Sequence, residues 1–395
     1  MAPVYKTPGV YREDVFLRLQ VQLPTGVPGF VGFGKTVTGA PVLLHRAEEL
    51  GTRFTPVADV DHRLPYLADA VAGFFGNGGE SCYVVGADAE GDHVKAIVGA
   101  LSQLGPLADL DLVAVPDAMI LPEEDIQRVQ AAVIAHCGEH GNRFAVLDAP
   151  GGKNPREVGV VDALNVAVDA LKDWCRAIIP SGAARSANAA LYYPWIKVPS
   201  VTVTGGKPVP PCGHVAGIFA RSDRRVGVFK APANEELDGV LDLEFPIDAA
   251  VQDQLNPEGI NCLRAFPGRG LRVWGARTLS VDLNWRYINV RRLFLTLVRW
   301  IDRNLAWAAF EPNTPRLWVR IQRDLNVHLG RLLQAGALKG ASASEAFYVK
   351  CDSETNPAEE REQGRVTTEI GLAPAAPAEF IVVRIIHGVG TAQFR

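Results

Sequence analysis

The stretch that decides the fold of this chain reads Gly268-Arg269-Gly270-Leu271-Arg272-Val273-Trp274-Gly275-Ala276-Arg277-Thr278-Leu279, and after four intervening residues it is followed by Asn284-Trp285-Arg286-Tyr287-Ile288-Asn289-Val290-Arg291-Arg292. It opens the most basic part of the sequence, because residues 264–339 hold fourteen Arg and Lys against four Asp and Glu, a net charge of +10. The whole chain carries −4, so all other residues together carry −14. This separation of charge along the chain indicates surfaces that meet other surfaces.

The composition is typical of a globular protein with room for two domains. Of the 395 residues, 48% are hydrophobic and 21% are charged, so a buried core is expected. The first residues lack the apolar segment of a signal peptide, and no apolar run of about 18 residues is present to span a membrane. The six cysteines form no CxxC pair and are expected to be buried thiols. We therefore expect synthesis and assembly in the cytoplasm, no direct membrane insertion, and release to the outside only as part of a particle.

Between residues 65 and 194 the hydrophobic period alternates between that of helices and that of strands. Helices are expected at 66–75, 93–104, 122–137 and 156–174, and strands at 81–85, 110–115, 143–147 and 189–193. This alternation predicts a mostly parallel sheet covered by helices. The chain is therefore expected to be α/β, or α+β overall, with one domain at 24–240 and a C-terminal α+β domain at 241–379.

Both ends of the chain carry a strand pattern next to residues that break regular structure, at 1–23 and at 380–395. In the first segment apolar residues alternate with polar ones, and the apolar ones are Val15, Leu17, Leu19 and Val21. In the second, residues 380–386 are apolar on both faces, and Ile381, Val383 and Ile385 share one face. Terminal strands without a local partner are typical of β-augmentation, in which a strand pairs with the sheet edge of a neighbour.

Two amphipathic helices are expected in the basic part of the chain. The first has an apolar stripe between residues 290 and 308, and the second has Thr314 as its N-cap and Pro315 as its first residue. The arginines assigned to their polar faces are Arg292, Arg299, Arg303, Arg316, Arg320 and Arg323. Such faces favour an acidic protein partner, because the guanidinium fork pairs with carboxylates. Nucleic-acid binding is the alternative, since five of the seven tryptophans lie in the same part of the chain.

Two further patterns match known binding sites only in part. The sequence Gly29-Phe30-Val31-Gly32-Phe33-Gly34-Lys35-Thr36 fits the phosphate-binding loop G-x-x-x-x-G-K-T, but Val37-Thr38-Gly39-Ala40-Pro41 cannot open the helix that the loop requires. A core strand is therefore favoured over a P-loop NTPase. His136 and His140 have metal-ligand spacing, but a solvated helix end is favoured because no second cluster lies near them in the sequence.

The opening stretch resembles the signature of contractile tail sheath proteins, and further motifs resemble the same family, in the right order, along nearly the whole chain. These motifs are Thr7-Pro8-Gly9-Val10-Tyr11-Arg12-Glu13-Asp14, Gly26-Val27-Pro28-Gly29-Phe30-Val31-Gly32-Phe33, Arg143-Phe144-Ala145-Val146-Leu147-Asp148, Tyr192-Tyr193-Pro194-Trp195, Ala216-Gly217-Ile218-Phe219-Ala220-Arg221-Ser222-Asp223, Lys230-Ala231-Pro232-Ala233-Asn234, Asn261-Cys262-Leu263-Arg264, Gly336-Ala337-Leu338-Lys339-Gly340, Ala346-Phe347-Tyr348-Val349-Lys350 and Pro377-Ala378-Glu379-Phe380.

This resemblance implies a structural sheath subunit of a contractile injection machine. Such a subunit is expected to polymerise into sixfold stacked rings around an inner tube, and to contract from a metastable extended state so that the tube is driven through a target envelope. The N-terminal arm (1–23) and the C-terminal arm (380–395) are expected to exchange strands with neighbours, swinging on residues 24–29 and 388–390. The domain at 24–240 would lie on the outside and the domain at 241–379 would face the tube, with the six arginines against its acidic groups.

The resemblance also implies which partners to expect and which not. Inner tube, baseplate and terminal cap proteins are the implied partners beside further copies of the chain, and sister sheath proteins in the same lattice are left open. No catalytic residue, cofactor, metal or nucleic acid is expected. Because the chain has no room for a large inserted outer domain, it is most similar to sheaths of extracellular contractile injection systems, and the tail sheath of a contractile-tailed phage is the alternative.

Overall fold

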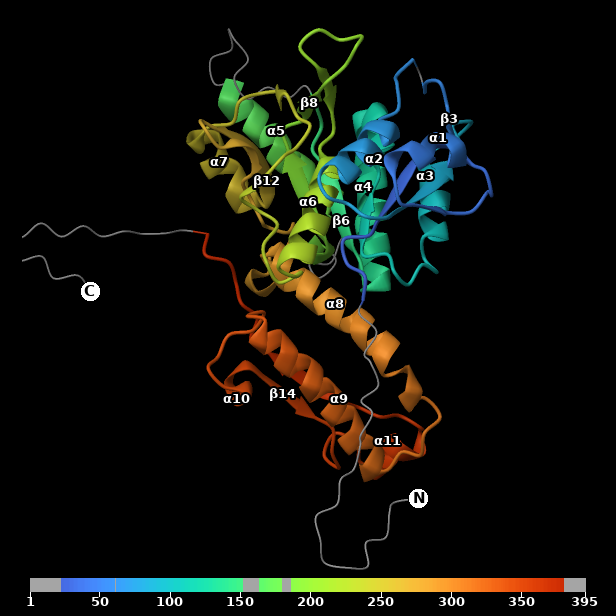
Figure 1. Ribbon diagram of the computed structural model, residues 1–395, viewed down its shortest axis with the longest axis vertical. Helices are drawn as coiled ribbons and strands as arrows, with labels where there is room; N and C mark the ends of the chain where they lie inside the picture. Colours follow the sequence, from blue (N-terminus) through green and yellow to red (C-terminus); the bar gives the residue numbers. More distant parts are fainter. Residues whose placement is uncertain (1–22, 61, 152–162, 180–185, 380–395) are drawn as a thin grey trace, which may run out of the picture.

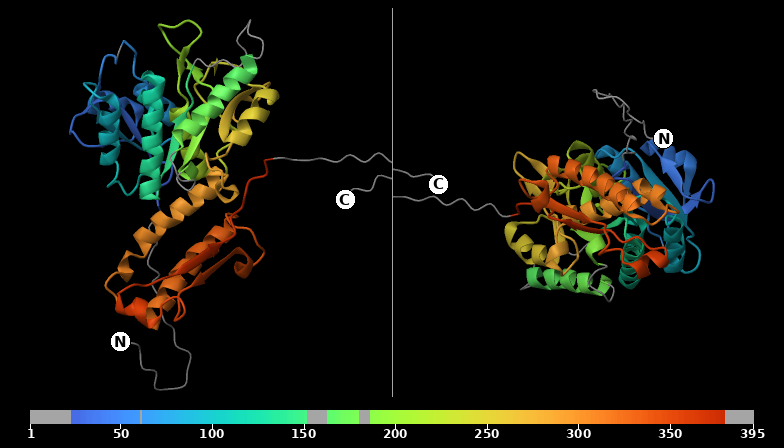
Figure 2. Two further views of the ribbon diagram at one scale, coloured as in Figure 1. Left: turned by 180° about the vertical axis from the view of Figure 1, so that it is seen from behind. Right: turned by 90° about the horizontal axis from the view of Figure 1, so that it is seen from below.

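The computed structural model describes residues 23–60, 62–151, 163–179 and 186–379. These residues form two bodies that are joined by the long helix α8 (Ile288–Asn304), as Figure 1 shows. The larger body is a sheet with helices on both faces, and the smaller body packs helices against a short sheet (Figure 2). The predicted fold class, a mostly parallel sheet domain plus a C-terminal α+β domain, is confirmed.

Among the described residues, the sheet of the larger body has ten strands in the order β10-β13-β12-β7-β6-β5-β1-β4-β2, with β3 paired to β1. The pairs from β4 through β1, β5, β6 and β7 to β12 are parallel. The strands are β1 (Pro28–Thr36), β2 (Val42–Leu44), β3 (Phe54–Pro56), β4 (Cys82–Ala87), β5 (Leu112–Ala114), β6 (Phe144–Asp148), β7 (Ala189–Tyr193), β10 (Glu235–Glu236), β12 (Ile260–Phe266) and β13 (Gly270–Val273). A second sheet of three strands holds β11 (Asp242–Leu243), β8 (Ile196–Val198) and β9 (Lys207–Val209).

Helices cover both faces of this sheet, which is why its central strands are apolar on both sides. One face packs against α3 (His93–Gln103), α4 (Glu123–His140), α5 (Ala163–Ile178) and α7 (Ala249–Leu255). The other packs against α2 (Leu67–Gly76) and α6 (Cys212–Arg225). Within β1, Phe30 joins the core on the α2–α6 side, and Val31 and Phe33 join the core on the opposite side. The short helix α1 (Leu50–Arg53) lies between β2 and β3 in the chain.

The predicted domain boundary at residue 241 is wrong. Strand β12 pairs parallel with β7 in the large sheet, with Ile260 opposite Leu191, and β13 follows it as an antiparallel neighbour. Helix α7 covers the same sheet. Because a long connection separates β7 from β12, their spacing in the sequence gave no indication that the sheet continues. The larger body therefore extends to the start of α8.

The smaller body is built on α8 and α9 (Pro315–Gln334), and α9 begins at Pro315 behind the N-cap residue Thr314, as predicted. Strands β14 (Phe347–Lys350) and β15 (Glu369–Leu372) form its antiparallel sheet, with α10 (Ala343–Ala346) and α11 (Ala358–Glu362) beside them in the chain. Helix α8 belongs to both bodies. Its residue Leu295 joins the core of the larger body, whereas Leu297 and Trp300 join that of the smaller one.

A buried carboxyl group at the end of β6 gives the larger body a pH-dependent stability. Asp148 accepts the backbone N–H of Cys212, the first residue of α6, at 2.8 Å. Burial raises the pKa of Asp148 to about 7, although hydrogen bonds from the Cys212 thiol and backbone oppose this. Because ionisation is less favourable in the folded protein than in the unfolded chain, this contribution to stability is present below about pH 4 and is lost as pH rises through about 7.

Asp148→Asn removes this titration, so we expect wild-type protein to lose about 2 kcal/mol of unfolding free energy relative to the variant between pH 5 and pH 8. Urea unfolding at several pH values measures the difference. Asp302→Asn, at an exposed position of α8, is the control and should leave the pH dependence unchanged. Equal pH slopes for wild type and Asp148→Asn would contradict this assignment.

Candidate functional site: the roots of the two terminal arms

The residues predicted to form the arms lie outside the described ranges: Val15, Leu17, Leu19 and Val21 at one end, and Ile381, Val383 and Ile385 at the other. The structure does describe the points from which both arms leave the protein. These are residues 23–27, ahead of β1, and residues 373–379, after β15. Each point is held by a polar cluster that includes arginines from the basic part of the chain, and these two clusters form the candidate site.

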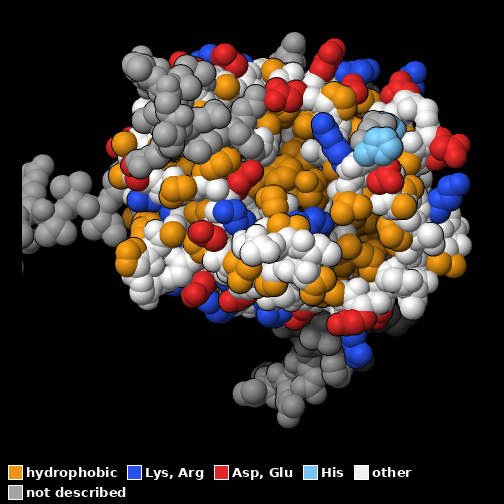
Figure 3. All heavy atoms as spheres, turned by 90° about the horizontal axis from the view of Figure 1, so that it is seen from above, with side chains coloured by type: hydrophobic (Ala, Val, Ile, Leu, Met, Phe, Trp, Pro, Cys, Tyr) orange, Lys and Arg blue, Asp and Glu red, His pale blue; other side chains and the backbone are white. Residues whose placement is uncertain are grey.

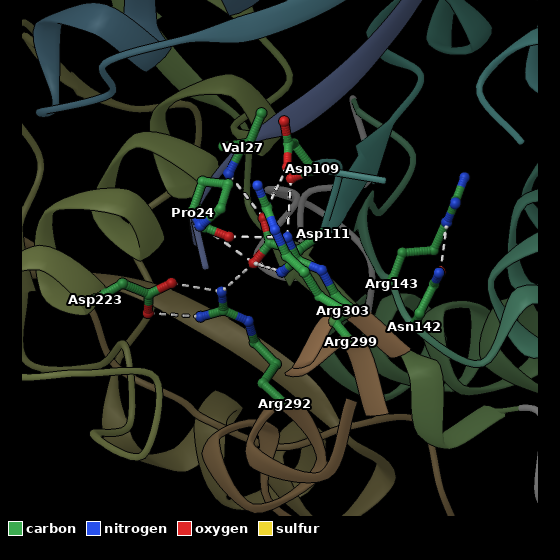
Figure 4. Close-up of polar contacts among 11 residues, drawn as sticks. Pro24, Val27, Asp109, Asp111, Asn142, Arg143, Asp223, Arg292, Arg299 and Arg303 are labelled. Atoms are coloured by element: carbon green, nitrogen blue, oxygen red, sulfur yellow. Dashed lines mark hydrogen bonds and ion pairs between the residues drawn. The ribbon is translucent and has the colours of Figure 1, made fainter. Parts of the chain in front are cut away.

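The first, the buried arginine cluster, consists of Asp111, Asp223, Arg292 and Arg299 (Figure 4). Arg292 of α8 donates to both carboxylate oxygens of Asp223 at 2.8 and 2.6 Å, and its Nη2 also donates to Asp111 Oδ2 at 2.9 Å. The Arg292 side chain is only 2% exposed, and its guanidinium lies 4.9 Å from the centre of the Phe219 ring. One cation is thus shared by carboxylates from the last turn of α6 and from the residue before β5.

The same cluster binds the backbone at the root of the N-terminal arm. Asp111 accepts the N–H of Val27 at 2.7 Å and the N–H of Gly26 at 3.1 Å. Arg299 donates from Nη2 to the carbonyl oxygens of Pro24 and Asp109, at 2.8 and 3.0 Å. Part of the segment on which the N-terminal arm is expected to swing, residues 24–29, is thus bonded to Asp111 and to Arg299 of α8, and its last residues belong to β1. The swing itself stays a prediction.

Burial and pairing act in opposite directions on the pKa values of the cluster. Burial raises the pKa of Asp223, and the charge and hydrogen bonds of Arg292 oppose this rise. Burial would lower the pKa of Arg292, but Asp223 and Asp111 raise it above its usual value. The guanidinium therefore stays protonated, and the stability of this buried charge depends on the carboxylates of Asp223 and Asp111 beside it.

The prediction that Arg292 and Arg299 face a partner protein is wrong. Both side chains are 2% exposed and point into the larger body (Figure 4). The amphipathic pattern identified the polar face of α8 correctly, but it does not tell whether that face meets solvent or buried carboxylates. The sequence does not identify Asp223 and Asp111 as the acidic partners, because they lie 69 and 181 residues away from Arg292.

The remaining four arginines are less buried. Arg303 pairs with Asp109 at 3.0 Å, and both side chains are partly exposed. Arg320 lies 4.0 Å from the centre of the Trp307 ring, Arg323 pairs with its neighbour Asp324 at 3.1 Å, and Arg316 is exposed in the first turn of α9. For Arg303, Arg316, Arg320 and Arg323 a role on an outer surface stays a prediction.

The second cluster, the C-terminal latch, holds Glu379, the last described residue. Arg277 donates to both carboxylate oxygens of Glu379, at 2.9 and 2.6 Å. Asn256 donates to the same carboxylate at 2.9 Å and the Tyr287 hydroxyl at 3.3 Å. Partial burial raises the pKa of Glu379, but the hydrogen bonds from Arg277 and Asn256 outweigh it and hold the pKa below its usual value. Arg277 and Glu379 lie 102 residues apart in the sequence, and no sequence pattern indicates that they form a pair.

The stretch that fits a phosphate-binding loop forms strand β1, so the interpretation as a core strand is confirmed. Helix α2, which lies against β1, already has a carboxyl group at its start: Asp117 accepts the N–H groups of Tyr66 and Leu67 at 2.6 and 2.7 Å, and also that of Phe33 at 2.8 Å. Figure 3 looks onto the face at the carboxyl ends of the parallel strands, where α/β folds bind nucleotides, and the hollow there is lined by hydrophobic side chains.

The two histidines with metal-ligand spacing, His136 and His140, contact each other and Arg143 of the same chain. The rings of His136 and His140 lie 4.5 Å apart, and the Arg143 guanidinium is 3.2 Å from His136 Nε2. Burial and the nearby Arg143 lower the pKa of His136 to about 4. Among the described residues, no three His, Cys, Asp or Glu side chains gather into a metal-binding group, and no helix is long and apolar enough to cross a bilayer.

Removing Arg292 tests the buried arginine cluster. Arg292→Met leaves the buried Asp223 without its cation and leaves Asp111 with Arg299 alone, at 3.7 Å, so we expect a loss of about 3–5 kcal/mol of unfolding free energy. Arg303→Met removes a surface pair and should cost about 1 kcal/mol or less. Urea unfolding measures both. If Arg292→Met does not fold, Arg292→Met with Asp223→Leu should restore folding, because it also removes a buried charge. Equal costs for the two single variants would contradict the account.

Comparison with known proteins identifies two domains of one family. Residues 178–279 match the phage tail sheath protein central domain, and residues 280–386 match the phage tail sheath C-terminal domain. The limit between the two matches lies just before α8, close to the limit between the two bodies.

Solved structures match the chain along nearly its full length. A chain in the baseplate of the anti-feeding prophage is 31% identical, with a TM-score of 0.77, over 98% of this chain and 100% of that one. A chain of the helical sheath of the same particle in its contracted state is 31% identical, with a TM-score of 0.74, over 97% and 99%. A chain of the PVC sheath complex, from an extracellular contractile injection system in its contracted state, is 27% identical, with a TM-score of 0.74, over 98% and 99%.

Relatives found by sequence are tail sheath proteins of phages and prophages. A prophage major tail sheath protein of Pseudomonas aeruginosa is 22% identical over 73% of this chain and 71% of its own length. The tail sheath proteins of a Vibrio phage and a Burkholderia phage are matched over only 27% and 41% of their lengths. Taken together with the two domain matches and the full-length structural matches, these relatives show that the chain belongs to the phage tail sheath protein family.

Proposed function

We propose that the chain is the structural sheath subunit of a contractile injection machine, with a mechanical and not a catalytic role. The observation that carries this proposal is the match, 31% identical over 97% of the chain, to the contracted helical sheath of the anti-feeding prophage. The similar match to the PVC sheath supports the form found in extracellular contractile injection systems. The tail sheath of a contractile-tailed phage is the second candidate, and the Pseudomonas aeruginosa prophage relative favours it.

In this proposal, copies of the chain form sixfold stacked rings around an inner tube protein, and baseplate and terminal cap proteins close the two ends. Sister sheath proteins would share the lattice where a particle has several. The assembly is metastable when extended, and it contracts to a form with more buried interface, so that no nucleotide is consumed.

Strand exchange between copies is the proposed joint, and the smaller body offers a place for it. Among the described residues, β14 and β15 pair only with each other, so each strand has one edge without a partner. An arm that adds about six main-chain hydrogen bonds gains about 1 kcal/mol from each. Ordering it costs about 1–2 kcal/mol per residue, so burial of the apolar arm residues, among them Leu17 and Val383, must contribute as well.

The surface of the smaller body is the proposed contact with the tube. Of the six arginines predicted for this role, Arg303, Arg316, Arg320 and Arg323 remain candidates, because they are not enclosed in the larger body. Arg316 and Arg323 are the most exposed of these on α9. Acidic groups on the tube would pair with them in the extended state and separate on contraction.

Removing the N-terminal arm tests strand exchange. We expect full-length protein to form striated hollow tubes, alone or with the inner tube protein, and protein that lacks residues 1–22 to stay dispersed. Negative-stain electron microscopy distinguishes the two. Leu17→Lys with Leu19→Lys should also prevent assembly, whereas Arg18→Ala with Gln20→Ala, on the other face of the same segment, should not. Tubes from the truncated chain would contradict the proposal.

Reversing two charges on α9 tests the contact with the tube. Arg316→Glu with Arg323→Glu should leave the protein folded and able to polymerise, but the particles should lack an inner tube or be fully contracted. Electron microscopy of particles co-expressed with the tube protein shows this directly. The control, Glu359→Lys with Glu362→Lys on α11, changes as many charges on the same body. Normal yields of extended, tube-filled particles from the α9 variant would rule out this contact.

A further inference from the structure

Several motifs that are distant in the sequence meet at one pocket of about 550 Å³ on the larger body. Its lining includes Ala233 and Asn234, Arg264, Trp274, Arg277 and Glu379. All of them belong to the stretches that carry the resemblance to tail sheath proteins, the opening stretch included. The pocket and the C-terminal latch are continuous, because Arg277 and Glu379 belong to both.

The wall of the pocket suits an apolar side chain better than a charged one. Alanines and two prolines supply much of the lining, and Trp274 adds an indole ring that lies 4.4 Å from the ring of Phe266. Arg264 donates to Gln252 at 2.9 Å, Gln252 donates to the Trp274 carbonyl at 2.6 Å, and Asp253 of the same wall is exposed to solvent. Among the described residues of this wall, only Arg264 has a buried side-chain atom, Nε, without a hydrogen-bond partner, and this N–H can donate to a carbonyl group of an occupant.

The segment after β15 runs from the smaller body toward the larger one, as the red trace in Figure 1 shows, and its last residues line the pocket. Ala373 donates its N–H to the Ala346 carbonyl at 2.8 Å, and Ala375 to the Ala337 carbonyl at 3.0 Å, both within the smaller body. Asn289 of α8 then binds the Ala375 carbonyl at 3.1 Å. At its end the segment reaches the larger body, where Glu379 is held in the pocket wall by the latch.

The next residue in the chain is Phe380, whose Cα lies about 3.8 Å from that of Glu379. Residues 380–395 lie outside the described structure, and the last described residues before them, Pro377, Ala378 and Glu379, line the pocket. The first of them is an aromatic residue, which matches the apolar wall and Trp274. A segment of this same chain is therefore the occupant that position and chemistry favour, ahead of a segment from a second copy.

We propose that this pocket binds the side chain of Phe380, and we call it the seat of Phe380. The C-terminal arm is then anchored to the larger body by the charge pair at Glu379 and by the aromatic side chain next to it. The arm then starts at the flank of the larger body and not at the edge of β15, and Ile381, Val383 and Ile385 are left for exchange with a neighbour. The seat itself does not depend on the proposed function; only the use of the arm does.

Photocrosslinking tests the seat in the full-length protein. Benzoylphenylalanine replaces Phe380, or Ile386 as the control position, and crosslinked peptides are mapped by mass spectrometry. We expect position 380 to crosslink to pocket residues, Trp274 or the segment around Ala249, and position 386 not to do so. A mixture of isotope-labelled and unlabelled protein tells whether the two peptides come from one chain or from two.

Two adjacent alanines of α7 give a matched pair of variants. Ala249 lines the pocket and Ala250 does not, and both are exposed. Ala249→Phe should lower the crosslink from position 380 to the level of the control position, and Ala250→Phe should leave it unchanged. Crosslinks to β14 or β15, crosslinks to the pocket of another chain, or no crosslink would each overturn the proposal. Electron microscopy of tube formation is a separate test of the proposed sheath function. A failed crosslink at position 380 therefore counts against the binding of Phe380 in the pocket and not against the sheath function.

Discussion

A guanidinium group that is removed from water needs carboxylates around it, and Arg292 obtains them from two distant places in the chain. Asp223 lies 69 residues away and Asp111 lies 181 residues away. Leaving either charge unpaired would cost several kcal/mol, so α6, the start of β5 and α8 are held in one arrangement. Asp111 also binds the backbone of Gly26 and Val27, which extends this arrangement to the root of the N-terminal arm.

The two bodies are connected at three places, and each is fixed by polar contacts or packing. Helix α8 contributes to both cores, residues 23–27 run from the core of the smaller body to β1, and residues 373–379 return from the smaller body to the C-terminal latch. We therefore expect the described part of the subunit to move as one unit. In a sheath of such units, the change between two lattices would take place in the arms and in the contacts between subunits.

Much of the fold could be predicted from the sequence, because periodicity reports local structure. The expected helices at 93–104 and 122–137 correspond to α3 and α4, and Thr314 and Pro315 mark the start of α9. What periodicity does not report is the identity of distant neighbours. It assigned the polar face of α8 to the outside, whereas Arg292 and Arg299 meet buried partners. It also ended the larger body too early, since the pairing of β12 with β7 crosses a long connection. The resemblance to tail sheath proteins supplied the function, but it did not show that Arg277 holds Glu379.

A cryo-EM reconstruction of tubes assembled from the full-length chain tests the central claim most directly. The account predicts that Arg292 keeps both Asp223 and Asp111 in every subunit, that residues 24–27 stay bonded to α8, and that adjacent subunits are linked by their terminal arms. Subunits in which the buried arginine cluster is open, or in which the two bodies are rotated relative to each other about α8, would contradict it.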